Sequence, residues 1–378
     1  MLYWVWNEKN YRRRKKSERG SVRARPQSNW KTACIKNNLI TRAALKQYGY
    51  LANSFDVVIS TFDPLWPHEV AREFKIRNPK VIWLADFRDP VYGTTHYCDP
   101  ASLEWAAKIT ENADLISYID DSGPNVLGIG PNRNTFMAIS NGYDDESVSP
   151  AFDGAHKNKY FTVVYTGTLY DIKLQNPAHI ISALNRLIED GIASEGSIEF
   201  IYAGPDGDIL STALSGDSKV KIINLGLVDR KDALQLQRES DVLILLTWNN
   251  QHEQGIATGK LYEYLAANRP ICAYVSGDTP GSVVKSILDS TRSGAAFEEG
   301  SGLSLAEEQM YKYFSELYVQ WSKTGYTQLV NADSSAYTHK RIAHNLSLAI
   351  DRLQKTSMNS TTDIERTKGN TERNDSCD

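Results

Sequence analysis

Short runs of aliphatic and β-branched residues alternate with helical patterns along most of the chain. Nine of these runs have the length of strands: residues 56–61, 80–86, 115–119 and 135–140 in the first half, and 161–167, 198–204, 220–226, 241–247 and 270–275 in the second. Runs that are apolar at consecutive positions predict strands buried between two layers of helices. The regular alternation predicts an α/β fold with two Rossmann-like, doubly wound domains, each built on a parallel sheet.

The two sets of strands are separated by a polar stretch rich in turn-forming residues, residues 141–158. We predict a flexible basic arm at residues 1–30, a first domain at 31–150 and a second domain at 151–336. A further helical pattern follows at residues 337–354. Large apolar residues are nearly absent from residues 355–378, which predicts a disordered tail.

Charge is distributed unevenly along the chain. The net charge of the 378 residues is −4, but residues 1–50 hold 13 Lys and Arg against 2 Asp and Glu, a net of +11. Residues 9–25 therefore predict attraction to an anionic membrane surface, and the alternative is a solvated arm with no specific partner. Tryptophan and tyrosine residues among the arginines could also stack on single-stranded nucleic acid, but no platform fold surrounds them, so nucleic acid is disfavoured.

Cysteine and histidine spacing argues against a metal site. The four cysteines are far apart with no CxxC pair, and the histidines have no ligand spacing. This pattern predicts a reduced, cytoplasmic setting and no bound metal. No stretch of about 18 apolar residues is present, so the sequence predicts no membrane-spanning helix.

The most informative segment is residues 254–270, QGIATGKLYEYLAANRP, in which a glycine-bearing loop leads into a helix. The first turn of such a helix offers free N–H groups to an anion. Gly259, Lys260 and Glu263 share one face of the helix. This arrangement suits a nucleotide, with the diphosphate on the amides and the ribose on the carboxylate. The alternative is an ordinary capped helix with an exposed ion pair.

Four other short motifs precede this segment along the chain: DFRDP at residues 86–90, YTGTL at 165–169, YAGP at 202–205 and LGLV at 225–228. Together with residues 254–270 they resemble the family 4 glycosyltransferases of bacterial surface-polysaccharide type. The resemblance covers residues 55–353. It implies the GT-B fold, in which two Rossmann-like domains face each other, and the return of helix 337–354 to the first domain.

The resemblance also implies what the protein binds and where it works. The expected donor is a nucleoside-diphosphate-sugar, with no metal or other cofactor, and the expected acceptor is lipid-linked or an oligosaccharide. It implies a retaining glycosyltransferase in surface-polysaccharide or lipopolysaccharide biosynthesis. The expected location is the cytoplasm, with the basic arm at the inner face of the plasma membrane.

Each matched position receives a role from the resemblance. Asp86, Arg88 and Asp89 would contact the acceptor or act as catalytic groups, and the alternative is a turn pinned by an internal Arg–Asp pair. The remaining positions would bind the donor: Gly167, Thr168, Lys173, Gly204, Val228, Glu253, Gly259, Lys260 and Glu263. His68 would lie on the side of the cleft, or else be exposed at the start of a helix.

Three departures from the family pattern affect these expectations. The first glutamate of the family's E-x7-E motif is Gly255 here, so Glu253 would have to take its place. The usual Gly-Arg pair reads Gly167-Thr168. The N-terminal part of the first domain is expected to be missing, which makes that domain incomplete. Two alternatives therefore remain: a sugar-nucleotide epimerase of the same fold, and a truncated, non-catalytic nucleotide-sugar-binding protein.

Overall fold

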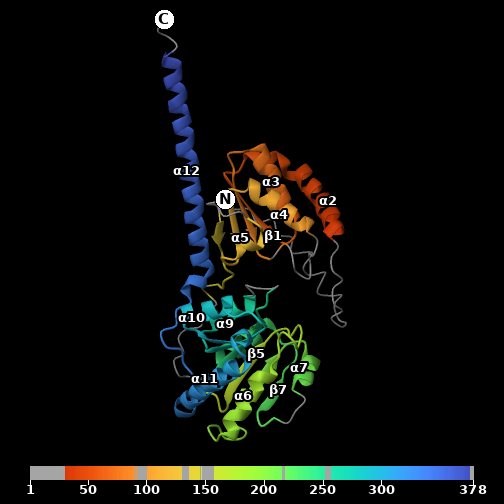
Figure 1. Ribbon diagram of the computed structural model, residues 1–378, viewed down its shortest axis with the longest axis vertical. Helices are drawn as coiled ribbons and strands as arrows, with labels where there is room; N and C mark the ends of the chain where they lie inside the picture. The colour runs from red at the N-terminus through yellow and green to blue at the C-terminus, as the bar shows by residue number, and fades with distance from the viewer. Residues whose placement is uncertain are drawn as a thin grey trace.

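The computed structural model describes residues 30–89, 91, 100–129, 136–144, 146, 157–214, 218–251 and 257–374, with side chains described to residue 356. These residues form two α/β domains, with the second below the first in Figure 1. A four-stranded sheet has the order β1-β2-β3-β4, and a six-stranded sheet has the order β10-β9-β8-β5-β6-β7. All strand pairs are parallel, which confirms the predicted fold class.

The described elements of the first domain lie between residues 30 and 138. Its strand β2 is buried along its whole length, as expected for a strand covered on both faces. The elements are α2 (Trp30–Tyr48), η1 (Gly49–Asn53), β1 (Val57–Phe62), α3 (Trp66–Arg77), β2 (Ile82–Phe87), α4 (Ala101–Asn112), β3 (Leu115–Tyr118), α5 (Gly123–Val126) and β4 (Phe136–Ala138).

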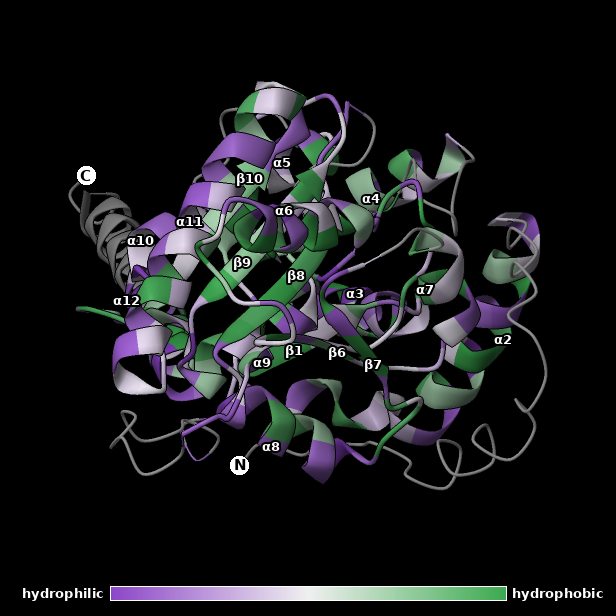
Figure 2. Cartoon of the chain, turned by 90° about the horizontal axis from the view of Figure 1, so that it is seen from below, coloured by the Kyte–Doolittle hydropathy of each residue, from purple (hydrophilic) through white to green (hydrophobic). Residues whose placement is uncertain are grey.

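The second domain continues the same alternation of strands and helices. Figure 2 shows β8 and β9 coloured as hydrophobic through the centre of this domain, with more polar helices around them. The elements are β5 (Phe161–Thr166), α6 (Ala178–Glu189), β6 (Ile198–Ala203), α7 (Gly207–Ala213), β7 (Lys221–Asn224), α8 (Arg230–Glu239), β8 (Val242–Trp248), α9 (Gly259–Ala267), β9 (Ile271–Ser276), α10 (Val283–Thr291), β10 (Gly294–Glu298), η3 (Glu299–Ser301), α11 (Leu303–Thr324), η4 (Ser335–Tyr337) and α12 (His339–Asn374).

Aromatic side chains form the centre of the first domain, and His68 lies among them. Its side chain is fully buried, 4.6 Å from the ring centre of Phe87, and its Nδ1 is 2.6 Å from Ser60 Oγ. Burial lowers the pKa of His68 to about 3, so the ring is neutral. The expectation that His68 faces the cleft or solvent is therefore wrong, because the helix that carries it packs its first turn against the sheet.

A buried ion pair lies at the amino-terminal ends of strands β5 and β8 in the second domain. Asp241, which precedes β8, accepts hydrogen bonds from the N–H and hydroxyl of Thr162 in β5, at 3.0 and 2.9 Å. Asn158 donates to the same oxygen at 2.9 Å, and Arg269 lies 3.6 Å from the other carboxylate oxygen. Both Asp241 and Arg269 are buried, so this network fixes the β5–β8 pairing.

The chain crosses between the domains twice at adjacent positions. The N–H of Tyr143, in the first crossing, donates to Tyr337 O at 3.1 Å, and the N–H of His339, in the second, donates to Tyr143 O at 2.8 Å. His339 Nδ1 also lies 2.7 Å from Asp144 Oδ1. We call residues Gly142–Asp144 and Tyr337–His339 the paired hinge.

Beyond the paired hinge, α12 runs beside the first domain and contacts β2 (Figure 1). The prediction of a disordered tail from residue 355 is corrected, because α12 continues to Asn374. A helix that is already nucleated extends at little cost. None of the helices in the described ranges is long and apolar enough to cross a bilayer.

Candidate functional site

Two glycines shape the ends of β5 and β6 in the second domain. Gly167, directly after β5, has φ +110° and donates its N–H to Ala203 O at 2.7 Å. A Cβ on Gly204, directly after β6, would lie 2.1 Å from Gly167 O. A side chain at Gly204 would therefore force the two backbones apart, and the positive φ of Gly167 disfavours any other residue there. The predicted donor residues Gly167 and Gly204 are therefore neighbours at the carboxyl-terminal ends of β5 and β6.

The ammonium of Lys260 lies in this glycine corner. Lys260 is in the first turn of α9, and its Nζ is 3.9 Å from the ring centre of Tyr165. A Cβ on Gly167 would come within 2.7 Å of the same Nζ. Burial lowers the pKa of Lys260 to about 7, although the charges of Glu263 and Asp206 oppose this shift. Lys260 thus places a titrating cation beside free backbone groups at the start of a helix.

Glu263 lies one turn further along α9 and faces α8. Its Oε1 is 2.9 Å from Nη1 of Arg230, the first residue of α8, and the Glu263 side chain is 33% exposed. Glu263, Arg230 and Gly259 line a cavity of about 250 Å³ that also touches the paired hinge. Sequence reasoning missed Arg230. The sequence signal that could have found it is a basic residue at the start of a helix, where acidic residues are usual.

The other predicted donor residues are placed less decisively. Thr168 O accepts a hydrogen bond from Tyr165 Oη at 2.8 Å, which shapes the loop after Gly167. Lys173 is exposed in the same loop, and its N–H donates to Asp171 Oδ1 at 2.9 Å.

Two further predicted donor residues lie elsewhere in the chain. Val228 is half-buried two residues before Arg230. Glu253 lies outside the described residues.

Asp86 and Arg88 are tied to each other at the end of β2. Arg88 Nε donates to Asp86 Oδ2 at 2.7 Å, and Ser117 Oγ donates to Asp86 Oδ1 at 2.6 Å. Arg88 Nη1 reaches Ile139 O and Ser140 O at 3.0 and 3.3 Å, beyond β4. This geometry fits the alternative of a turn pinned by an internal pair. Asp89 remains an exposed carboxylate next to it.

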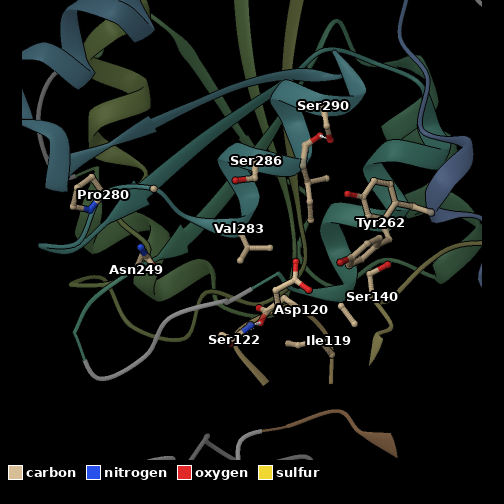
Figure 3. Close-up of a pocket in the computed structure, with 15 residues that line it drawn as sticks. Ile119, Asp120, Ser122, Ser140, Asn249, Tyr262, Pro280, Val283, Ser286 and Ser290 are labelled. Carbon is tan, nitrogen blue, oxygen red and sulfur yellow. Dashed lines mark hydrogen bonds between the residues drawn. The ribbon is translucent and has the colours of Figure 1, made fainter. Parts of the chain in front are cut away.

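A cleft of about 590 Å³ lies between the two domains (Figure 3). The first domain contributes Asp120, which follows β3, and Ser140, which follows β4. The second domain contributes Tyr262 of α9 and the α10 serines Ser286 and Ser290. Sequence reasoning missed Asp120, although a polar group directly after a buried strand is a usual signal for a ligand site in an open sheet.

Helix α9 serves both regions. Successive helical residues point about 100° apart, so Tyr262 points away from both Lys260 and Glu263. Tyr262 is 2% exposed and its ring lies 5.8 Å from that of Tyr337. One helix therefore contributes residues both to the cation-bearing corner and to the cleft between the domains. Within the described ranges, no group of three or more His, Cys, Asp or Glu residues is arranged to hold a metal ion.

Comparison with solved structures identifies the fold. A protein from Listeria monocytogenes assigned as a UDP-N-acetylglucosamine 2-epimerase matches with a TM-score of 0.51 and 12% identity, over 85% of this chain and 80% of that one. A UDP-forming trehalose-phosphate synthase from Burkholderia xenovorans matches with a TM-score of 0.50 and 14% identity, over 85% and 78%. The N-terminal domain of trehalose-6-phosphate phosphatase from Candida albicans matches with a TM-score of 0.56 and 12% identity, over 85% and 75%.

These structures share with this chain the GT-B arrangement of two Rossmann-like domains. The name of the first contains UDP-N-acetylglucosamine, and the name of the second says that it forms UDP. Neither a scan of protein-family profiles nor a search of curated proteins gives a match to this chain.

Proposed function

We propose that this protein transfers a sugar from a nucleoside-diphosphate-sugar to a hydroxyl group of an acceptor. The observation that carries the proposal is the position of Lys260. Its ammonium lies against Gly167 at the start of α9, with Glu263 one turn away on the same helix. A cation and free backbone amides stabilise a diphosphate, and a carboxylate accepts hydrogen bonds from the hydroxyls of a ribose.

The chemistry of the reaction explains why a cation is useful at this position. As the glycosidic bond breaks, its electron pair moves to the departing nucleoside diphosphate, which gains negative charge. Lys260 and the N–H groups of the first turn of α9 are fixed in place to stabilise that charge. The proposal assigns this role to protein groups rather than to a resident metal. Arg230 would orient Glu263 toward the ribose.

We further propose a retaining reaction with a lipid-linked or oligosaccharide acceptor, in the biosynthesis of a surface polysaccharide. The support is the sequence resemblance to family 4 glycosyltransferases. In that reaction the donor's own phosphate oxygen receives the proton of the acceptor hydroxyl. Closure of the two domains about the paired hinge would exclude water and suppress hydrolysis of the donor.

Donor binding tests the proposal directly. A panel of UDP-, ADP- and GDP-sugars, titrated by isothermal calorimetry, should contain at least one ligand that binds the wild-type chain. Glu263→Gln should weaken that ligand at least tenfold, because the ribose loses a charged acceptor. The matched control is Glu195→Gln, which changes an exposed residue just before the start of β6 and should leave binding unchanged. Equal binding by both variants would contradict the role of Glu263.

The epimerase alternative is separated by the products. Incubation with a binding donor and a mixed set of sugar acceptors should give a new glycoside, detected by mass spectrometry. Conversion of the free donor into its epimer, with no dependence on acceptor, would instead support the epimerase. Donor binding without either product would support a non-catalytic binding protein.

We also propose that the basic arm attaches the protein to the inner face of the plasma membrane. At about 1 kcal/mol for each basic residue near an anionic surface, residues 9–25 suffice for reversible binding. Deleting residues 1–29 should reduce binding to phosphatidylglycerol vesicles at least tenfold in 0.1 M salt, measured by sedimentation. Phosphatidylcholine vesicles and high salt should both reduce wild-type binding. Unchanged binding by the deletion variant would refute this attachment.

A further inference from the structure

We propose that the cleft between the domains binds an uncharged, hydroxyl-rich sugar as the acceptor, with Asp120 receiving a hydrogen bond from one of its hydroxyls. Phosphorylated sugars would be excluded from the same place. This inference rests on the proposed function and names the chemical class of its second substrate.

The cleft has the size and position that an acceptor requires. Its volume of about 590 Å³ is within the range of roughly 300–1,000 Å³ found for small-molecule sites. Tyr262 forms part of its wall and belongs to the same short helix as Lys260 and Glu263. The cleft therefore adjoins the donor residues of α9, and contact between an acceptor and the donor sugar requires such a position.

The carboxylate of Asp120 has one satisfied oxygen and one unsatisfied oxygen. Asp120 Oδ1 accepts hydrogen bonds from the N–H of Ser122, at 2.8 Å, and from its hydroxyl. Asp120 Oδ2 is buried and has no hydrogen-bond partner among the described residues. Leaving a buried acceptor unpaired costs free energy. A ligand hydroxyl that donates to Oδ2 would remove this cost.

Figure 3 shows how the two domains face each other here. Asp120 projects from the first domain toward α10 and α9, with Ser286 and Ser290 opposite and Tyr262 and Ser140 to one side. The burial of Tyr262 and the negative charge of Asp120 both contribute to raising the pKa of the Tyr262 hydroxyl, which places the two groups within electrostatic reach. Each hydroxyl group can donate one hydrogen bond and accept two, so this wall is complementary to the hydroxyls of a sugar.

The charges of the cleft decide which sugars can enter. Among the described residues that line it, the charged ones are Asp120 and Asp121, and none is Lys, Arg or His. Arg88, which also interacts with Tyr262, is held by Asp86 and by the carbonyls of Ile139 and Ser140. A phosphate in this space would meet two carboxylates without a cation, and like charges repel strongly where water is excluded.

The donor site has the opposite character, because Lys260 and Arg230 supply cations there. The donor residues thus form an anion-binding region, and the adjoining cleft carries only negative charge among its charged lining residues. This division would keep the donor diphosphate out of the acceptor position and a phosphorylated sugar out of the cleft.

Acceptor binding to the full chain tests the inference without requiring turnover. Methyl glucoside, methyl galactoside and N-acetylglucosamine, with glucose 6-phosphate as the charged probe, would be titrated by saturation-transfer NMR in the presence of a nucleoside diphosphate. At least one uncharged sugar should bind, and glucose 6-phosphate should bind at least tenfold more weakly. Asp120→Asn should weaken the bound sugar at least tenfold, because the amide keeps the cap on Ser122 and turns a donor toward the sugar. Asp351→Asn, an exposed change on α12, should have no effect.

Donor affinity, measured in parallel, distinguishes a failure of the proposed function from a failure of the inference on the acceptor. Asp120→Asn should leave the dissociation constant of the nucleoside-diphosphate-sugar and the melting temperature unchanged, since the altered oxygen has no partner in the protein. Absence of donor binding to the wild type would refute the proposed function. With donor binding intact, the inference on the acceptor is overturned by tighter binding of glucose 6-phosphate, by unaltered sugar binding in Asp120→Asn, or by no sugar binding at all.

Discussion

Replacing Lys260 with methionine is expected to abolish diphosphate binding and to stabilise the unliganded protein at the same time. The ammonium is packed against Tyr165 and Gly167, and burial lowers its pKa to about 7 from an ordinary value near 10.5. Each unit by which burial lowers this pKa corresponds to about 1.4 kcal/mol of lost stability when the lysine is protonated. Because Lys260 is only half-buried, we expect a gain of about 2 kcal/mol, or a rise in melting temperature of about 4–8 °C.

The pH dependence of this effect has a definite sign. Between pH 7 and 10.5 the unfolded chain keeps the Lys260 proton that the folded chain has lost, so the stability of the wild type rises with pH in that window. The advantage of Lys260→Met should be full below pH 7 and vanish above about 10.5. Donor affinity should have the opposite slope and weaken above pH 7, because only the protonated ammonium attracts the diphosphate.

Differential scanning fluorimetry and calorimetric titration of a nucleoside-diphosphate-sugar check both effects. The sugar-linked diphosphate has no ionisation of its own near neutral pH, so the slope reports on the protein. Lys285→Met, which removes an exposed cation from α10, should change neither quantity by much. A Lys260→Met variant that still binds the donor with wild-type affinity would remove the main support for the proposed function.

Replacing Asp241 with alanine is expected to be the most destabilising single change. Alanine would leave Arg269 buried without its counter-charge and would remove three hydrogen bonds from Asn158 and Thr162. Removing one partner of a buried pair typically costs about 3–5 kcal/mol. Chemical denaturation should therefore show a midpoint well below that of the wild type.

Two further variants make the Asp241 result interpretable. Asp241→Asn keeps the shape and part of the hydrogen bonding, so it should fold even if the alanine variant does not, with an intermediate loss. Asp289→Ala removes an exposed partner of Lys285 and should change stability by less than about 1 kcal/mol. A small loss in both Asp241 variants would show that the network does not secure the β5–β8 pairing.

The sequence pattern predicted the positions of the strands better than it predicted which side chains are buried. All nine predicted strands are present, because long β-branched runs between turn formers leave little choice of structure. Strand β10 was missed, since its sequence GAAFE has no β-branched residue and becomes a strand only by pairing with β9. His68 was misplaced for a similar reason: its burial depends on tertiary packing, which helical spacing alone does not specify.

The candidate site divides in the same way. Gly259, Lys260 and Glu263 lie within five successive positions of the sequence, so their common location on α9 could be predicted from helix geometry. Arg230 and Asp120 reach the site from other elements, and no local pattern connects them to α9. The pairing of Arg88 with Asp86 was foreseen as an alternative, because two charges two residues apart at a strand end can meet within one turn.

The paired hinge restricts how the two domains can move. A single connecting strand would allow rotation about several axes, whereas two segments bonded side by side through Tyr143 and His339 resist torsion between the domains. We expect the remaining freedom to be bending at the bonded residues of the paired hinge. Such bending would vary the width of the cleft while preserving its alignment, so under the proposed function acceptors of different length would be admitted without changing which hydroxyl meets the donor.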